Sequence, residues 1–323
     1  MSDNHARASP TVEAIAGFTA GVATTVAVHP LDVIKTRLQI QRKASSPTAT
    51  SALTIFRTLI SSKHPLQSLY RGTTPNLIGN ASSWSLFFYS KSLVEQQLAS
   101  FHARPSQPLS DSGHSPLPDD PRSALTPLDY FVAASLSGGL TSFSTNPIWV
   151  IKTRMLGSDR GAAGAYSSIW HGAREVMKNE GLRGFYRGFG VSLLNNSHGA
   201  VQFAVYDPLR NMWKAYSREE KFGNTATMLI SGAAKIIAGT VTYPFQVVRS
   251  RSQMNDARNV YGEGITGVVA KIWKEEGASG FYRGLGTSVV RVLPATWVTF
   301  LVYENVKYYL SLLEQARDQE IGS

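Results

Sequence analysis

The same ordered set of landmarks occurs three times along this chain. The segments PLDVIKTRLQ, PIWVIKTRML and PFQVVRSRSQ begin at Pro30, Pro147 and Pro244, and each carries a basic residue at its sixth and eighth positions. A Tyr-Arg-Gly triplet follows each proline, with its Tyr 40, 39 and 38 residues downstream, and a further Tyr comes 19, 20 and 21 residues later. Self-similarity of this kind indicates a repeat architecture, in which one structural unit is present three times.

Each repeat combines two long apolar segments with a basic loop between them. No Asp, Glu, Lys or Arg occurs in four stretches, Ala14–Leu31, Gly72–Ser90, Tyr130–Ile151 and Gly188–Tyr206. These stretches are close to the ~20 residues that a helix needs to span hydrocarbon. We therefore predict an all-α membrane protein with six transmembrane helices in three pseudo-symmetric two-helix repeats, each with a short amphipathic helix in its loop. The predicted spans cover residues 11–41, 74–100, 127–157, 190–216, 225–254 and 287–312.

The expected domains follow from these spans. Repeat 1 covers residues 11–100, repeat 2 covers 127–216 and repeat 3 covers 225–312. The first repeat period, 117 residues, is longer than the second, 97 residues, and a Pro/Ser-rich segment at 101–126 accounts for the surplus. That composition is typical of a disordered loop.

The distribution of positive charge predicts an orientation. The loops inside the repeats hold fourteen Lys and Arg residues, whereas the opposite side holds six. The positive-inside rule places the richer side in the inner compartment, so both termini face the other way. The first fourteen residues, MSDNHARASPTVEA, resemble neither a signal peptide nor an Arg-rich transit peptide, so we expect internal targeting information.

Composition and motif spacing argue against other classes of protein. The net charge is +10, but the cations are scattered over the repeats and form no continuous basic helix, so we expect no nucleic acid partner. The absence of cysteine excludes disulfides, thiolate metal sites and a cysteine nucleophile. RGFGVSLL and RGLGTSVV contain Gly-x-Gly, but Leu193 and Val289 stand where a dinucleotide-binding enzyme needs a small residue, and no strand precedes them.

On these motifs the chain resembles the mitochondrial carrier family. The family pattern is Pro-x-acid-x-x-base-x-base, followed later by acid-Gly, four residues and aromatic-base-Gly. Glu180-Gly181 and Glu276-Gly277 match the acid-Gly pair, whereas repeat 1 has His64 there. The resemblance implies a monomeric transporter that is not an enzyme, with odd-numbered helices kinked at the prolines and short helices on the matrix face. It also implies a multi-pass protein of the mitochondrial inner membrane with termini in the intermembrane space, although a peroxisomal membrane stays open. The expected surroundings are a lipid bilayer, with anionic lipid at the matrix side.

The proline motif predicts a gate, which we call the inner gate. On a helix Asp32 and Lys35 lie about 60° apart and can face a central axis together. In the family, such residues form a ring of ion pairs that closes the matrix side, and a Gln position braces them. By this resemblance the inner gate comprises Asp32, Lys35, Lys152, Gln246, Arg249, Gln39 and Gln253.

The inner gate departs from the family pattern in two repeats. Trp149 and Gln246 occupy the acid position, while the bases Lys35, Lys152 and Arg249 remain, so only one of three ion pairs can form fully. The substitutions are either neutral replacements in a weaker gate or part of a positive ring that attracts an anionic substrate. In the second interpretation Trp149 stacks on a flat ring of that substrate.

An outer gate is implied by a second family signature, which runs aromatic-acid-x-x-base. Tyr206, Asp207 and Arg210 match it, as do Tyr303, Glu304 and Lys307. Repeat 1 has Tyr89 but lacks the acid and the base, so this gate is incomplete as well.

The central site is predicted from charges within the spans. A charge at mid-membrane depth is costly, so Lys235 and Arg291 need an explanation. Either they snorkel or pair structurally, or they are fixed cations in a water-filled cavity for a phosphate or carboxylate substrate. Arg291 occupies the family's register for a substrate-contacting base, and Leu194 and Asn195 occupy the matching register on the fourth helix. Asn80 and Trp84 share one helix face. Either they present an amide and a stacking surface to a heteroaromatic ring, or Trp84 is a core residue of a packed helix.

The expected substrate is an anionic heteroaromatic small molecule. PIW in repeat 2, the sequence around Lys235 and SVVRVLPA around Arg291 resemble the family branch that carries FAD, folate, NAD and pyrimidine nucleotides. SHGAVQFAVYD in the fourth helix resembles FAD and folate carriers, and we favour FAD as a transported substrate, with no bound cofactor or metal. Folate or NAD transport is the alternative, and a membrane scaffold that transports nothing is the interpretation from another class.

Overall fold

The chain folds into helices throughout the part that the structure describes. This computed structural model describes residues 10–42, 51–102, 125–159, 161–162, 164–217, 224–262 and 264–321, and it contains no strand in those ranges. Repeat 1 contains α1 (Pro10–Ile40), α2 (Ala52–Ile60), α3 (Pro65–Leu69) and α4 (Thr73–His102). Repeat 2 contains α5 (Pro127–Gly157), α6 (Ile169–Glu180), α7 (Leu182–Phe185), α8 (Phe189–Asn195) and α9 (Ser197–Ser217). Repeat 3 contains α10 (Asn224–Ser252), α11 (Ala257–Tyr261), α12 (Gly264–Glu276), the 3₁₀-helix η3 (Ala278–Tyr282) and α13 (Leu285–Ile321).

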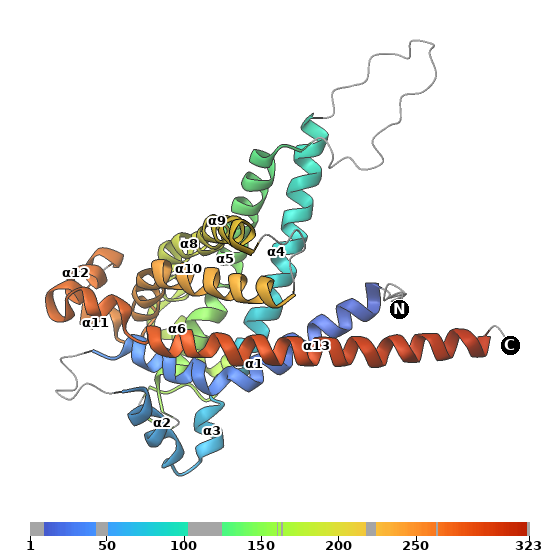
Figure 1. Cartoon of the computed structure of the whole chain (residues 1–323). Helices are drawn as coiled ribbons and strands as arrows, with labels where there is room; N and C mark the ends of the chain where they lie inside the picture. Colours follow the sequence, from blue (N-terminus) through green and yellow to red (C-terminus); the bar gives the residue numbers. More distant parts are fainter. Residues whose placement is uncertain are drawn as a thin grey trace.

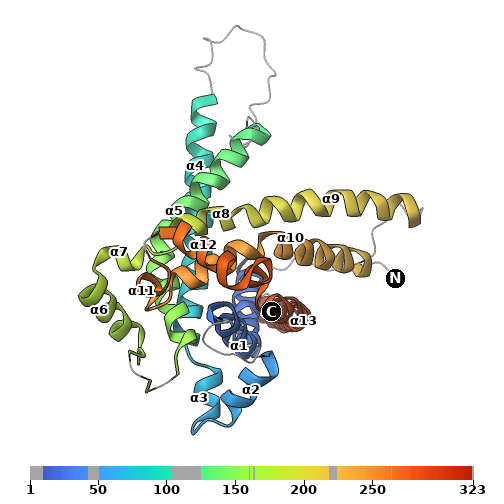
Figure 2. The ribbon, with the colours of Figure 1, turned by 90° about the vertical axis from the view of Figure 1, so that its left-hand side faces the viewer.

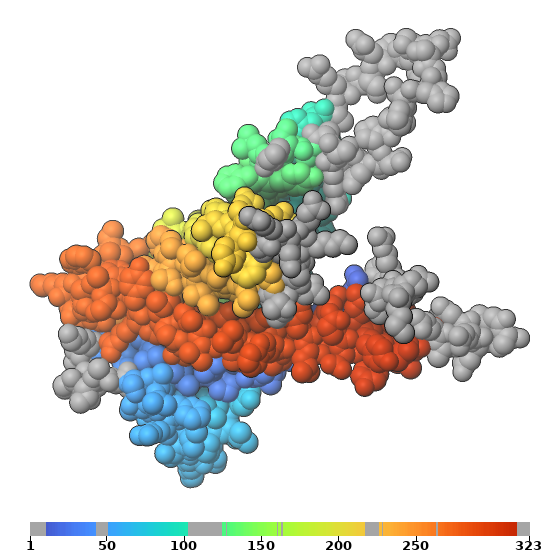
Figure 3. All heavy atoms as spheres, viewed as in Figure 1, coloured from blue at the N-terminus to red at the C-terminus, as the bar shows by residue number. Residues whose placement is uncertain are grey.

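The long helices pack as three antiparallel pairs, each of which joins two different repeats. The pairs are α4 with α5, α9 with α10, and α13 with α1. The three pairs diverge from one region, which we call the junction. The short helices α2, α3, α6, α11 and α12 lie around the junction on the side away from the diverging ends of the pairs (Figures 1 and 2). On the face of Figure 3, the side chains of α13 form a continuous band between those of α1–α3 and those of α9 and α10. The bundle is therefore closed at the junction and spread at the other end.

The predicted spans correspond to the long helices, with one difference. The expected span at 190–216 is divided into α8 and α9 at Asn196. The Asn196 N–H bonds to the carbonyls of Ser192 and Leu193, and the Ser197 hydroxyl donates to the Leu194 carbonyl. A short polar side chain that bonds to nearby backbone competes with a regular helical ladder, and the Ser197 hydroxyl does so where the two helices are divided.

Two of the described helices are long and apolar enough to cross a membrane by length and composition alone. They are the segments Thr11–Ile40 and Ala278–Glu314. The expected loop at 101–126 lies almost wholly outside the described residues, so its predicted disorder stays a prediction.

The Tyr-Arg-Gly triplets directly precede α4, α8 and α13, and their glycines lie against the proline-motif segment of a neighbouring repeat. Their glycines, Gly72, Gly188 and Gly284, have φ values of 76°, 72° and 86°. This left-handed conformation is available to Gly at little cost. A Cβ atom on Gly284 would lie 3.0 Å from the Tyr243 hydroxyl and 3.3 Å from the Lys35 carbonyl oxygen. The triplet thus ends in Gly both for its backbone conformation and for this close approach.

A cyclic set of arginine contacts closes the junction. The eighth-position arginine of each proline motif donates from Nε to a backbone carbonyl of the next repeat. Arg37 bonds to Leu156 at 3.2 Å, Arg154 to Gln253 at 2.9 Å, and Arg251 to Gln39 at 2.9 Å. Since the three acceptors occupy the same register, the ring has approximate threefold symmetry.

Candidate functional site

The inner-gate residues meet at the junction, but they do so mainly without ion pairs. Lys35 donates from Nζ to the Gln246 side-chain oxygen at 3.0 Å. The Lys152 ammonium lies 4.6 Å from the centre of the Trp149 ring, and the Arg249 guanidinium lies 5.8 Å from it. Both distances allow cation–π attraction. A hydrogen bond and an aromatic ring therefore stand where the motif would otherwise supply ion pairs.

The acid of the inner gate contacts a different base from the one that the motif suggested. Asp32 Oδ1 lies 2.8 Å from Arg291 Nε, and Arg291 comes from α13. We expected Asp32 to pair within the ring of gate bases. Because α13 packs along α1, the guanidinium of Arg291 reaches the carboxylate from the neighbouring helix. One predicted substrate residue is thus joined directly to the inner gate.

Two polar residues that sequence reasoning missed surround Asp32. The Asn76 side-chain amide lies 3.5 Å from Asp32 Oδ2 and 3.3 Å from His29 Nδ1. The other His29 nitrogen, Nε2, is 2.9 Å from the Arg71 carbonyl oxygen. Asn80, a predicted substrate residue, donates from its side-chain amide to the side-chain oxygen Oδ1 of Asn76 at 3.4 Å. Asp32 therefore belongs to a polar network that reaches α4.

A signal for His29 was present in the repeats. The residue before each motif proline is His29, Asn146 or Tyr243, and all three are buried. Asn146 donates to the Phe185 carbonyl at 2.6 Å, and the Tyr243 hydroxyl donates to the Arg283 carbonyl at 3.1 Å. Each pre-proline side chain therefore binds the backbone of the Tyr-Arg-Gly triplet, or of the residue just before it, in its own repeat. Polar residues at the same position in all three repeats indicate this role.

The two predicted bracing residues, Gln39 and Gln253, are buried beside the inner gate. Gln39 donates to the Tyr243 hydroxyl at 3.2 Å and accepts from Ser250 at 2.9 Å. Gln253 accepts from the Thr153 hydroxyl at 2.8 Å. These contacts join neighbouring repeats rather than touching the gate acid or bases.

The other predicted substrate residues lie along the helices that leave the junction. Lys235 on α10 is exposed, and no ion pair to another described residue is seen for it. Leu194 is exposed on α8, and Asn195 has a buried side-chain oxygen without a hydrogen-bond partner among the described residues. Trp84 on α4 is stacked on Phe88, with ring centres 5.7 Å apart. Their assignment to a binding site stays a prediction.

The predicted outer-gate residues lie toward the spread ends of the helix pairs. Lys307 binds Glu13 of α1 at 3.1 Å and lies 5.6 Å from the centre of the Tyr303 ring. Tyr89, Asp207, Arg210 and Glu304 are exposed, and Tyr206 is partly buried. Among the residues that the structure describes, Lys307, the outer-gate base of repeat 3, is thus paired with Glu13 of α1 and not with the outer-gate acids.

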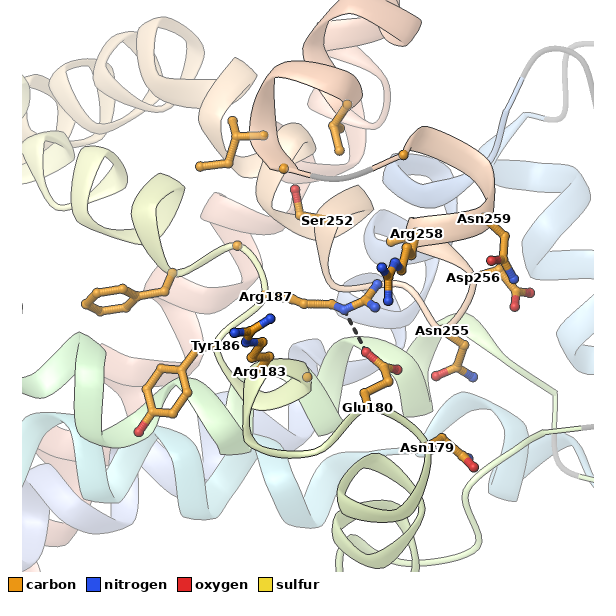
Figure 4. A pocket seen from close by; sticks show the side chains of 18 of the residues that line it. Asn179, Glu180, Arg183, Tyr186, Arg187, Ser252, Asn255, Asp256, Arg258 and Asn259 are labelled. Atoms are coloured by element: carbon orange, nitrogen blue, oxygen red, sulfur yellow. Dashed lines mark ion pairs between the residues drawn. The ribbon is translucent and has the colours of Figure 1, made fainter.

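A separate cavity of about 820 Å³ lies between repeats 2 and 3 on the short-helix side of the junction, and none of the predicted site residues lines it. Figure 4 shows Arg187 directed at Glu180, with Arg258 close by. The Arg187–Glu180 distance is 2.6 Å. Burial lowers the pKa of the Arg187 guanidinium, Glu180 opposes this effect, and Arg154 and Arg258 add to it. This cavity belongs to the joint between repeats and is distinct from the inner gate.

Three helical repeats that meet at a polar gate at one end are the architecture expected of a solute carrier. Comparison with known sequences identifies the class further: the mitochondrial carrier protein family matches residues 6–101, 123–217 and 220–313. The chain belongs to the mitochondrial carrier family, whose members are transporters and not enzymes. The predictions of family and of an all-α three-repeat fold are thereby confirmed.

Several relatives are similar over nearly the whole chain. The mitochondrial FAD carrier protein of Saccharomyces cerevisiae is 33% identical over 308 residues, which cover 92% of this chain and 96% of the relative. The chloroplastic folate transporter 1 of Arabidopsis thaliana is 34% identical over 316 residues, covering 94% and 95%. The chloroplastic nicotinamide adenine dinucleotide transporter 1 of Arabidopsis thaliana is 31% identical over 306 residues, covering 92% and 91%. By these names the relatives carry heteroaromatic small molecules.

Proposed function

We propose that this chain transports FAD across the mitochondrial inner membrane by alternating access. The observation that carries the proposal is the excess of cations where the helices converge. Lys35, Lys152, Arg249 and Arg291 lie there with one gate acid, Asp32. An unbalanced group of partly buried cations favours an anionic ligand, and a pyrophosphate supplies such charge. The full-length similarity to a FAD carrier supports the choice of flavin nucleotide.

In this proposal the predicted site residues divide between the two parts of the substrate. Arg291 and Lys235 bind phosphate oxygens, because guanidinium and ammonium groups donate charge-assisted hydrogen bonds to them. Trp149, Trp84, Asn80, Leu194 and Asn195 contact the flat rings. The carrier acts as a monomer with its termini in the intermembrane space. The inner gate faces the matrix, where the basic loops meet anionic lipid.

The test is uptake of labelled FAD into liposomes that contain the purified chain. Liposomes are preloaded in parallel with FAD, folate, NAD or buffer. Saturable uptake, inhibited by unlabelled FAD and lost in Arg291→Ala, is expected. Lys274→Ala is the matched control, because it removes one cation from an exposed surface of α12 and should leave uptake unchanged.

Folate is the second candidate, because a folate transporter is 34% identical over 94% of this chain, and NAD is the third. Uptake of labelled folate or NAD without uptake of FAD would replace the substrate and keep the carrier. Failure to transport any of the three from folded protein would favour another substrate or a scaffold role.

A further inference from the structure

Asp32 is connected to two of the residues that we assign to the substrate. It contacts Arg291 directly at 2.8 Å and reaches Asn80 through Asn76, by contacts of 3.5 and 3.4 Å. These residues come from three different helices, α13, α4 and α1. The carboxylate therefore occupies the part of the site in which an anionic group of a substrate would lie.

The Asp32–Arg291 contact differs from the structural arginine pairs of this protein. Arg251 binds Glu276 with two hydrogen bonds of 2.6 and 2.9 Å, and both side chains are buried. For Arg291 the contact with Asp32 is made by Nε, and this atom is buried without an aligned hydrogen-bond partner among the described residues. Its side chain is 37% exposed, compared with 1% for Arg251. A guanidinium carries five N–H donors. Arg291 thus retains N–H donors that a second anion can use.

We propose that Asp32 is an internal counter-anion, which holds Arg291 in the empty carrier and is displaced by the anionic group of the substrate. This inference rests on the proposed function, namely transport of an anionic heteroaromatic molecule. A substrate must then attract Arg291 more strongly than one carboxylate does. A pyrophosphate meets this requirement better than a single carboxylate, so Asp32 contributes to the selection of phosphate-bearing substrates.

Displacement also changes the inner gate. Lys152 lies within electrostatic reach of Asp32, while its ammonium is held over Trp149. Once Arg291 has turned to the substrate, Lys152 and Lys35, which both lie within electrostatic reach of Asp32, are the nearby bases with which the released carboxylate can pair. Substrate binding and the pairing pattern of the inner gate are therefore linked through one side chain.

A purely structural ion pair predicts the opposite response to mutation. If Asp32 only positioned Arg291, its removal would weaken binding, because Arg291 would lose its orientation. If Asp32 competes with the substrate, its removal strengthens binding. The sign of the change in affinity separates the two roles.

The experiment measures the affinity of the purified full-length chain for FAD and for inorganic pyrophosphate at fixed ionic strength. Asp32→Asn is expected to bind both probes about tenfold more tightly, an effect within the range of coupling between close charge pairs. Asp32→Glu restores the carboxylate and should return the affinity toward that of the wild type. Glu175→Gln is the control for net charge, because it also removes one negative charge, but from α6. It should leave both affinities unchanged.

The second arm tests whether the effect passes through Arg291. In an Arg291→Gln background, Asp32→Asn should have no effect on either affinity. An equal gain in that background would show a general charge effect and overturn the proposal. Unchanged, weaker or absent pyrophosphate binding by folded Asp32→Asn would overturn it too.

The same measurements separate this inference from the choice of substrate. If pyrophosphate shows the expected pattern while FAD binds to no variant, the counter-anion stands and FAD is the wrong substrate. If FAD is transported but Asp32→Asn does not bind it more tightly, the counter-anion fails and FAD transport stands.

Discussion

The acid partners of the three ring arginines should contribute very unequally to stability. In repeat 3 the Arg251 and Glu276 side chains are 1% and 3% exposed. In repeat 2 Arg154 binds Glu180 with two hydrogen bonds, of 2.7 and 3.1 Å, and Glu180 is slightly more exposed. In repeat 1, where the acid-Gly pair is missing, Arg37 instead binds Asp159, which is 66% exposed.

Removing the acid tests this ranking. Glu276→Gln leaves the Arg251 charge buried without its counter-ion, and breaking a buried pair from one side costs about 3–5 kcal/mol. Asp159→Asn breaks an exposed pair, for which the loss is at most about 1 kcal/mol. Glu180→Gln should fall between them, because the Glu180 carboxylate is partly hydrated. At about 2 °C per kcal/mol, the apparent Tm should fall by roughly 6–10 °C for Glu276→Gln and by at most about 2 °C for Asp159→Asn.

The assay is thermal unfolding of the purified chain in one detergent, at one protein concentration and one heating rate, because an irreversible transition depends on the rate. Each variant changes a carboxylate to its amide, so shape and size are matched. Equal Tm shifts for all three variants, or the largest shift for Asp159→Asn, would refute the argument from burial.

Three further predictions concern single positions. Gly284→Ala should reduce the yield of folded protein, because a φ of 86° is strained for any residue with a Cβ and that Cβ would lie only 3.0 Å from a Tyr hydroxyl, which would have to shift. Gly286→Ala, with open space around it, should fold normally in the same expression test. Trp149→Leu should lower the apparent Tm of the substrate-free carrier more than Trp149→Phe, because Phe keeps a ring for cation–π contacts of about 0.5–2 kcal/mol each; an equal loss would count against those contacts. Glu13→Gln should leave the Tm unchanged, since its pair with Lys307 at 3.1 Å is largely exposed to solvent, and a clear fall would show that this pair stabilises the fold.

Helix positions could be predicted from the sequence because local features determine them. The charge-free runs and the prolines placed α1 and α5 almost as the structure has them. The division between α8 and α9 was not predicted. It coincides with the shared backbone hydrogen bond of the Asn196 N–H and with the bond from the Ser197 hydroxyl to the Leu194 carbonyl, and apolar periodicity carries no information about them.

The partner of Asp32 could not be predicted in the same way. Motif spacing places Asp32 and Lys35 on one face of a helix, but it does not say which base arrives from another helix. Arg291 follows Asp32 by more than two hundred residues in the sequence, and their contact arises because the last helix packs on the first. Asn76 was missed for a related reason, since its role depends on the position of α4 beside α1.

The symmetry of the junction and the asymmetry of the inner gate have a common physical explanation. Arg37, Arg154 and Arg251 bind backbone carbonyls, so their ring does not depend on the side chain of the acceptor residue. Leu156 serves as well as Gln39 or Gln253 in this respect. The side chains of the inner gate are consequently free to differ between repeats without loss of the closed bundle. Because the backbone ring closes the junction, Asp32 can pair with a residue outside the gate.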